Sequence, residues 1–304
     1  MKLQRRFFAS VALASFFILH PTLLVRAATT INPASKFAYG ANIGWMDWRG
    51  DTNSGALVGE YICTGFIYAA NVGWINLGSG TPANGIRYQN NSASDFGVNH
   101  DGLGNLRGYA YGANIGWITF TNRDASGSAY EGPQIDLVTG KMNGFLWSAN
   151  CGWISLSNTF ASVQTDTIQM GIDTDGDGIP DAWEREKFGG SLAAASGATD
   201  FDGDGFKDIS EYLADTDPND PKSFLSITSY TIATGDSPLS LRWSSNPTRQ
   251  YHLQKRALVD SGSWFDVGLG LISADAGTMT IRSFTDSASS QRFFRVEAVK
   301  PLSP

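Results

Sequence analysis

Four segments of the chain repeat one pattern, an aromatic stretch followed by Ala-Asn-x-Gly-Trp. They are FAYGANIGWMDW (37–48), FIYAANVGWINL (66–77), YAYGANIGWITF (109–120) and FLWSANCGWISL (145–156). Residue types alternate on both sides of the Asn-x-Gly, as in β-strands, and this tripeptide favours a type I turn followed by a glycine in a bulge. A pattern that recurs in this way indicates one shared supersecondary unit. We therefore predict four β-hairpins, grouped in a β-hairpin repeat domain over residues 28–168.

The register of these hairpins decides what their tryptophans do. If Ser148 pairs with Trp153 across the turn, the fourth hairpin has an apolar face for the core and a mixed face. The apolar face then holds Phe145, Trp147, Ile154 and Leu156, and the mixed face holds Leu146, Ser148, Trp153 and Ser155. Two interpretations stay open for the turn-proximal Trp45, Trp74, Trp117 and Trp153. Each ring covers its own hairpin or seals it against the next repeat, or the four rings form an aromatic shelf that stacks on sugar rings.

Two acidic stretches, DTDGDGIPDAWE (173–184) and DFDGDGFKDISE (200–211), place acids at positions 1, 3, 5, 9 and 12 and glycine at position 6. This is the calcium-loop spacing of the EF-hand, in which alternate residues point oxygens at one centre and the Glu at position 12 binds bidentately. Position 7 offers its backbone carbonyl, and position 9 often binds through water. The predicted calcium ligands are Asp173, Asp175, Asp177, Ile179, Asp181 and Glu184 in the first loop, and Asp200, Asp202, Asp204, Phe206, Asp208 and Glu211 in the second. Magnesium fits this donor set less well, because it prefers fewer protein ligands.

The surroundings of the loops differ from those of a standard EF-hand. Position 8 is Pro180 in the first loop and Lys207 in the second, and proline has no N–H for the short β-bridge that usually pairs two loops. The residues before Asp173 read as a strand, whereas DAWEREKFG and DISEYLADT predict a short helix after each loop. The groups expected to pack these helices are Trp183, Phe188, Tyr212 and Leu213.

The run DTDGDGIPD resembles thrombospondin type 3 calcium repeats and their bacterial relatives. The resemblance implies a segment of tandem calcium-binding loops, residues 169–222. The sequence departs from the thrombospondin pattern in the Glu at position 12 and in the missing cysteines. Dockerins, which also carry two such loops, are the alternative family. Against a dockerin, positions 10 and 11 hold the unlike pairs Ala182-Trp183 and Ile209-Ser210, where related recognition residues would be expected.

The last part of the chain, residues 223–304, reads as an antiparallel β-sandwich. Strands are expected at 224–232, 239–245, 250–258, 264–271, 277–285 and 292–299. The order of its aromatic and aliphatic residues, from Trp243 to the Phe294-Arg-Val run, resembles a fibronectin type III module that stops where that family's last strand would begin. The resemblance implies a structural or adhesive module rather than chemistry.

Residues 1–27 combine a basic start, an apolar run and a small-residue cleavage site, which predicts a secretory signal peptide. Pro21 interrupts the apolar run before it reaches the roughly 20 residues needed to span a bilayer, so we expect no transmembrane anchor in the mature chain. Residues 170–222 carry fourteen acids and four bases, a net charge of −10, against −7 for the whole chain. This charge is the opposite of a nucleic-acid-binding footprint and excludes DNA and RNA as main partners.

Few residues point to an enzyme. His100 and His252 lie in different predicted domains and outside any metal or nucleophile motif, so each is expected to be an ordinary surface histidine. Asp101 and Asp136 could form a carboxylate pair, but nothing in their spacing selects them. The two cysteines, Cys63 and Cys151, allow one disulfide or a buried free pair.

These observations predict a mainly β, exported and non-catalytic protein that binds calcium. Its Asn-x-Gly-Trp repeats resemble those of secreted bacterial surface proteins. The expected role is that of a calcium-rigidified spacer in a structural or adhesive protein, located outside the cell, on its surface or in the periplasm. A glycan-binding protein that uses the hairpin tryptophans and a dockerin-like assembly module are the alternatives. A cell-surface polysaccharide or another surface protein is the expected partner besides calcium.

Overall fold

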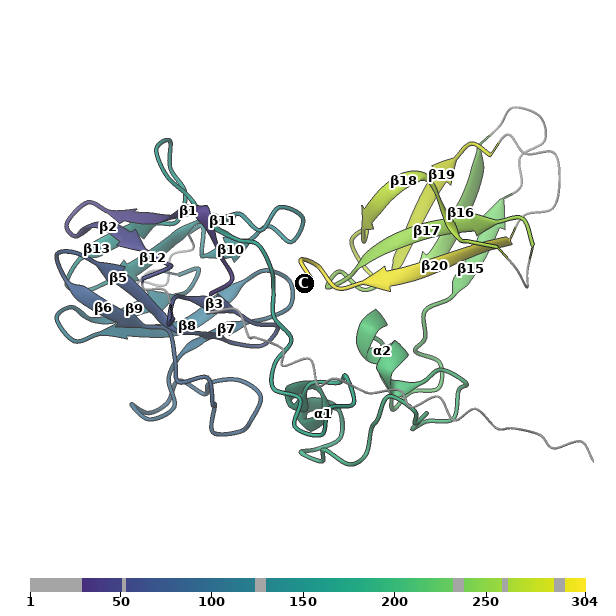
Figure 1. Cartoon of the computed structure of the whole chain (residues 1–304), viewed down its shortest axis with the longest axis horizontal. Coiled ribbons are helices and arrows are strands. Elements are labelled where there is room, and N and C mark those ends of the chain that lie inside the picture. Colours follow the sequence, from purple (N-terminus) through teal and green to yellow (C-terminus); the bar gives the residue numbers. More distant parts are fainter. Residues whose placement is uncertain (1–28, 51–52, 124–129, 232–237, 259–261, 287–292) are drawn as a thin grey trace, which may run out of the picture.

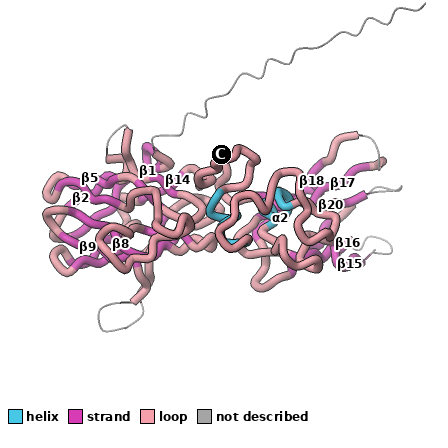
Figure 2. The backbone as a smooth tube through the Cα atoms, turned by 90° about the horizontal axis from the view of Figure 1, so that it is seen from below, coloured by secondary structure: helices cyan, strands magenta, loops and turns pink. Residues whose placement is uncertain are grey.

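The computed structural model describes residues 29–304, except 51–52, 124–129, 232–237, 259–261 and 287–292. The chain is mainly β, as predicted, with a closed sheet near the N-terminus, two short helices in the middle and a sandwich near the C-terminus (Figure 1). The two β parts lie at opposite ends of the long axis in Figure 2, and Figure 1 shows the two helices below them. The predicted signal peptide, residues 1–27, lies outside the described residues. The domain limits at 168 and 222 stay predictions.

The four repeats form the four predicted hairpins, and these hairpins build one closed sheet. Its strands are β1 (Ile31–Gly40), β2 (Gly44–Asp47), β5 (Phe66–Ala69), β6 (Gly73–Asn76), β8 (Leu106–Gly112), β9 (Gly116–Phe120), β12 (Phe145–Ser148) and β13 (Gly152–Ser155). Each hairpin pairs antiparallel with the next one. The last hairpin then pairs with the first, through Tyr39 opposite Ser155 and Gly40 opposite Ile154. The closed sheet therefore has no free edge among these eight strands.

Shorter strands extend or flank the closed sheet. β14 (Val163–Thr165) pairs with β1, and β7 (Val98–His100) pairs with β8. Two small ribbons, β3 (Leu57–Val58) with β4 (Cys63–Thr64) and β10 (Gln134–Ile135) with β11 (Met142–Asn143), lie in the connections between hairpins. Cys63 and Cys151 are both buried and free.

The predicted turn is present, but the predicted pairing across it is wrong by one residue. Ser148 lies opposite Gly152, so Trp147 and not Ser148 shares a face with Trp153. The turn has three residues, and the bulge glycine that closes it has a positive φ (73° at Gly152), which other residues adopt at a cost. Because strand side chains alternate, this shift moves Phe145 and Trp147 from the expected core face to the outer face.

Small and aliphatic residues consequently fill the inside of the closed sheet. The inner positions before the turn are Ala38 and Gly40, Ile67 and Ala69, Ala110 and Gly112, and Leu146 and Ser148; Met46, Ile75, Ile118 and Ile154 follow the turns. The third turn residue folds inward as well, and a Cβ added to Gly40 would lie 2.9 Å from Ile43. Small residues are therefore required inside the strand ends, where the turns pack.

A ring of asparagine side chains joins the four turns. Each amide donates to a backbone carbonyl in the turn of the preceding hairpin, at 2.9–3.1 Å. The four bonds run from Asn42 to Cys151, from Asn71 to Ile43, from Asn114 to Val72 and from Asn150 to Ile115. The asparagine of the repeat thus links neighbouring hairpins, in addition to shaping its own turn.

The C-terminal part is a sandwich of two three-stranded antiparallel sheets, as predicted. One sheet holds β15 (Ile227–Thr231), β16 (Leu239–Ser244) and β19 (Met279–Phe284), and the other holds β18 (Phe265–Ser273), β17 (Gln250–Arg256) and β20 (Phe293–Val299). Both sheets contribute to one core, in which Trp243 and Tyr251 contact each other edge to face. Among the described residues, no helix has both the length and the apolarity that a membrane crossing requires.

Candidate metal centre

The two acidic loops lie between the β domains, and each ends in a short helix. α1 (Asp181–Lys187) follows the first loop and α2 (Asp208–Ala214) follows the second, as predicted. Pro180 and Lys207, at position 8, immediately precede the helices with extended backbone. No β-bridge joins the two loops in the described part of the chain, which agrees with the expectation from the proline.

The Asp at position 1 shapes each loop. Asp173 accepts hydrogen bonds from the backbone N–H groups of Gly176 (2.8 Å) and Gly178 (3.0 Å), and Asp200 accepts the equivalent bonds from Gly203 and Gly205. These four glycines all have positive φ values, 94° at Gly178 for example. The repeated Asp-Gly-Asp-Gly sequence therefore gives the same curved backbone twice, because only glycine adopts these angles without strain.

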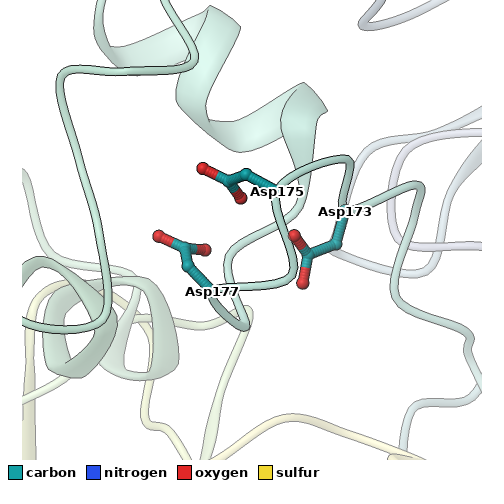
Figure 3. Close-up of side chains that lie close together, drawn as sticks. All are labelled: Asp173, Asp175 and Asp177. Carbon is teal, nitrogen blue, oxygen red and sulfur yellow. The ribbon is translucent and has the colours of Figure 1, made fainter. Parts of the chain in front are cut away.

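The curved backbone gathers three carboxylates in each loop. One oxygen from each of Asp173, Asp175 and Asp177 lies within 4.8 Å of the others, and Asp200, Asp202 and Asp204 are arranged in the same way. Figure 3 shows the first three side chains around one space inside the loop. Oxygens bound to one calcium ion at 2.3–2.6 Å are separated by distances of this order. Each loop thus presents three of its predicted ligands to one point.

The Glu at position 12 completes the acidic surroundings from inside the protein. Glu184 is fully buried, and neither of its carboxylate oxygens has a hydrogen-bond partner within the described residues. Burial, together with the charges of Asp175 and Asp177, raises the pKa of Glu184 to about 7. A buried acid without a partner and beside other acids is unfavourable as an anion. A bound cation would remove this penalty.

Glu211 repeats this environment in the second loop. It is 1% exposed, its Oε2 has no partner among the described residues, and Thr216 donates to its Oε1 at 3.3 Å. Burial raises its pKa to about 7, and the charges of Asp202 and Asp204 add to the shift. The second carboxylate oxygens of Asp202 and Asp204 are also buried without partners in the described chain. The unsatisfied oxygens of the second loop therefore belong to three of its predicted ligands.

The Asp at position 9 has a different set of contacts. Asp181 accepts hydrogen bonds from the backbone and the hydroxyl of Thr174, at 2.8 and 2.7 Å. Asp208 accepts from the backbone of Phe201 and from the hydroxyl of Thr199. Both oxygens of each carboxylate thus tie the start of the helix to the start of its loop. A calcium contact through water at this position stays a prediction.

The side chains at position 7 do not resemble each other. Ile179 is buried, whereas Phe206 is 39% exposed and stacks on Phe224 with the ring planes 10° apart. Their predicted contribution is a backbone carbonyl, which does not depend on the side chain. That contribution stays a prediction for both residues.

A small core of its own holds the two helices together. Ile179, Trp183, Ala195 and Tyr212 are buried in one cluster, and the rings of Trp183 and Tyr212 lie 5.7 Å apart. Phe188 packs against this cluster, as expected, but Leu213 is 42% exposed. Ala195 comes from the Gly/Ala/Ser-rich connection between the loops. Its burial could not be predicted from that composition.

The candidate catalytic residues have structural roles. His100 is buried and not at the surface as expected; its Nε2 accepts from the backbone of Gly104, and burial lowers its pKa. Asp101 accepts from two backbone N–H groups of the turn that follows it. Asp136 does the same in its own turn, which holds its pKa below the ordinary value despite some burial. Each of these groups is thus used to shape the backbone.

The spacing of the oxygen donors in the two loops agrees with a comparison of the chain with known protein families. Both loops match the family model of the bacterial TSP3 repeat, over residues 173–189 and 200–221. These are calcium-binding repeats with a structural role. No curated protein and no solved structure matches the chain. Since the family match covers the loops alone, the resemblances of the hairpin repeats and of the C-terminal sandwich stay predictions.

The residues present fit a calcium ion. Each TSP3 loop combines three clustered aspartates with a buried glutamate, and all of these donors are oxygens, the ligand atoms that calcium takes in proteins. Neither loop contains histidine or cysteine, which softer metals prefer. The chain therefore carries two loops that match a calcium-binding repeat family, located between the closed sheet and the C-terminal sandwich in the sequence.

Proposed function

We propose that this protein is exported and non-catalytic, and that its TSP3 segment is a calcium-rigidified spacer in a cell-surface or extracellular structural or adhesive protein. The observation that carries the proposal is the burial of Glu184 and Glu211 in a segment that contacts both β domains. Both oxygens of Glu184 and Oε2 of Glu211 have no hydrogen-bond partner among the described residues. Calcium would neutralise these acids and order two loops. The relative position of the flanking domains would then depend on calcium.

Contacts between the TSP3 segment and each β domain support the spacer role. Arg87 of the closed-sheet domain forms an ion pair with Glu186 of α1, at 2.6 Å. Arg249 of the sandwich donates to the carbonyls of Tyr212 and Leu213 at the end of α2, at 2.8 Å each. A segment bonded on both sides can transmit its own order to the domains that it joins.

Small-angle scattering of residues 28–304, with calcium and with chelator, tests the spacer. The proposal predicts a larger radius of gyration after chelation, because ten uncompensated negative charges expand the segment. Both β domains should keep their circular-dichroism signals. An unchanged radius, or the loss of both domains on chelation, would count against the spacer.

A second candidate function, glycan binding, is favoured by the exposure of the turn-proximal tryptophans. Trp45, Trp74, Trp117 and Trp153 are 44–46% exposed on the outside of the closed sheet. In the first three hairpins the ring centre of the tryptophan lies 4.9 Å from that of a tyrosine of the same hairpin. This contact supports the interpretation that each tryptophan also covers its own hairpin. Exposed aromatic surface of this extent is typical of interaction sites. A glycan array on the wild type, with Trp74→Ala as the matched variant, tests whether sugars bind here.

The dockerin-like alternative has less support. Trp183, at position 11 of the first loop, is 1% exposed and packs inside the TSP3 segment. A recognition residue would have to be accessible to a partner. We therefore retain the spacer as the proposed function.

A further inference from the structure

One tyrosine joins all three parts of the molecule. The hydroxyl of Tyr212, on α2, donates to the Glu60 carboxylate, with distances of 2.8 and 3.0 Å to its two oxygens. Lys300 donates to the Tyr212 hydroxyl oxygen and to the Glu60 carboxylate, at 2.6 Å in both cases. Glu60 lies between β3 and β4 of the closed-sheet domain, and Lys300 follows the last strand of the sandwich. We call these three residues the junction.

The junction is sheltered, which strengthens its charged hydrogen bonds. Tyr212 is 1% exposed, and the side chains of Lys300 and Glu60 are 17% and 16% exposed. The Lys300 ammonium also lies 4.5 Å from the centre of the Tyr212 ring. Charge-assisted bonds and cation–π contacts are both stronger where water is largely excluded. The three side chains therefore form one mutually dependent group.

Further contacts hold the sandwich beside the junction. The backbone of Ile168 donates to the carbonyl of Leu302 at 2.8 Å, and Leu302 packs on the core of the closed sheet. Asp215, at the end of α2, accepts from the Thr248 hydroxyl of the sandwich. Figure 1 shows the C-terminus between the two β domains, near α2. The last residues of the chain thus contact the first domain close to the helix that carries Tyr212.

Tyr212 of the junction directly follows Glu211, the last predicted ligand of the second loop, in the sequence. Glu211 and Tyr212 both lie on α2, and both are buried. Glu211 is 1% exposed in the first turn of α2, and its Oε2 has no partner among the described residues. A cation bound by the second loop would supply that partner and hold the helix from which Tyr212 projects.

The helix of the first loop packs against the Tyr212 ring through Trp183, but it is not hydrogen-bonded to both β domains within the described residues. This helix, α1, bonds to the closed-sheet domain through Glu186 and Arg87. Within the described ranges, α1 has no hydrogen bond or ion pair with residues 223–304. α2, in contrast, is bonded to the closed sheet through Glu60 and to the sandwich through Lys300 and Arg249.

We propose that the second TSP3 loop, and not the first, controls the three-way junction: its calcium ion orders α2, and Tyr212 then locks both β domains to each other through Glu60 and Lys300. The inference rests on the calcium role proposed above. It assigns that role to one loop and one hydroxyl group.

This assignment is tested by measuring distances between the two β domains in a protein that comprises residues 28–304. Spin labels at Val138→Cys and Ile281→Cys report on the closed-sheet domain and the sandwich, since both positions are exposed and the native cysteines are buried. Pulsed electron paramagnetic resonance should give a narrow distance distribution with calcium and a broad one with chelator. Calorimetry on the same samples counts the bound calcium ions.

Four variants separate calcium binding by the loops from the fixing of the two β domains by the junction. Tyr212→Phe keeps the ring in the small core but removes the hydroxyl, so it should bind calcium at both loops and still give a broad distribution. Lys300→Met, outside the TSP3 segment, should do the same. Glu211→Gln should lose one calcium ion and the narrow distribution, whereas the matched Glu184→Gln should lose one ion and keep the narrow distribution.

The outcomes distinguish the two proposals. If the wild type binds no calcium, the spacer and the junction both fail. If it binds calcium but Tyr212→Phe and Lys300→Met stay narrow, the junction is overturned while the calcium role stands. If Glu184→Gln and Glu211→Gln broaden the distribution equally, the assignment to the second loop is wrong.

Discussion

The side-chain amide of Asn42 donates to the backbone carbonyl of Cys151 at 3.1 Å, across 109 positions of the sequence. This bond links the turn of the first hairpin to that of the fourth. It lies directly beside the pairing of β1 with β13 that closes the sheet. The first and last repeats are therefore neighbours, and every hairpin in the ring has two others beside it.

Removing this amide should destabilise the closed sheet. Asn42→Ala loses one partly buried hydrogen bond, for which we expect a cost of about 0.5–1.5 kcal/mol in the free energy of unfolding. Asn42→Asp should cost more, because a carboxylate would face the Cys151 carbonyl without a donor between them. Urea unfolding measures both. If the Asp variant is as stable as the wild type, the ring of amide bonds does not hold the closed sheet.

Tryptophans on the two sides of the sheet should differ in their importance for stability. Trp48 is 1% exposed inside the closed sheet, and Trp45 is 46% exposed outside it. We expect Trp48→Ala to cost about 3–5 kcal/mol and Trp45→Ala roughly half as much or less. Thermal or urea unfolding gives both values. Equal costs would show that Trp45 is a packing residue first, and would weaken the glycan-binding candidate.

The register of the hairpins shows where sequence reasoning stops. The strand after each turn was predicted correctly, with Trp153 outside and Ile154 inside. The side chains of the strand before the turn were assigned to the wrong face of the sheet. The turn has three residues instead of four, and this difference moves each side chain of that strand to the opposite face. Glycine and alanine at the inner positions gave no contrary signal. They are small because Ile43 and its equivalents fold inward, a contact that no local pattern reveals.

The clustering of three aspartates in each loop was easier to predict than the junction, for a physical reason. The ligands of one loop lie within twelve residues, so their spacing encodes the geometry directly. Glu60, Tyr212 and Lys300 are 152 and 88 positions apart and come together only when three folded parts meet. The contacts of Asp181 and Asp208 with their own loops also could not be predicted, because position 9 varies in its use.

Calcium binding should depend on pH through Glu184 and Glu211. Their pKa values are raised to about 7 in the calcium-free protein, so below pH 7 calcium has to displace protons and its affinity should fall. The stability of the calcium-free segment should change with pH in the opposite direction to the calcium affinity. It should fall as the pH rises from the ordinary glutamate pKa of about 4.5 to 7, because the folded state holds these protons more tightly than the unfolded state.

Calorimetry in two buffers of different ionisation enthalpy measures this proton release. At pH 6 we expect about one proton released per loop, and close to none well above pH 7. Glu184→Gln and Glu211→Gln should each remove the release of one loop. The same binding heat in both buffers at pH 6 would contradict the protonated state of these two acids.

Calcium binding by the tandem TSP3 loops can be measured by titrating chelator-treated protein with calcium in a calorimeter. We expect two ions per chain, bound at roughly 10⁻⁴ to 10⁻³ M as in extracellular modules. Binding should disappear in the double variant Glu184→Gln, Glu211→Gln. If the wild type gives no binding heat at millimolar calcium, confirmed by equilibrium dialysis, or if the double variant binds as the wild type does, the two loops are not the calcium sites.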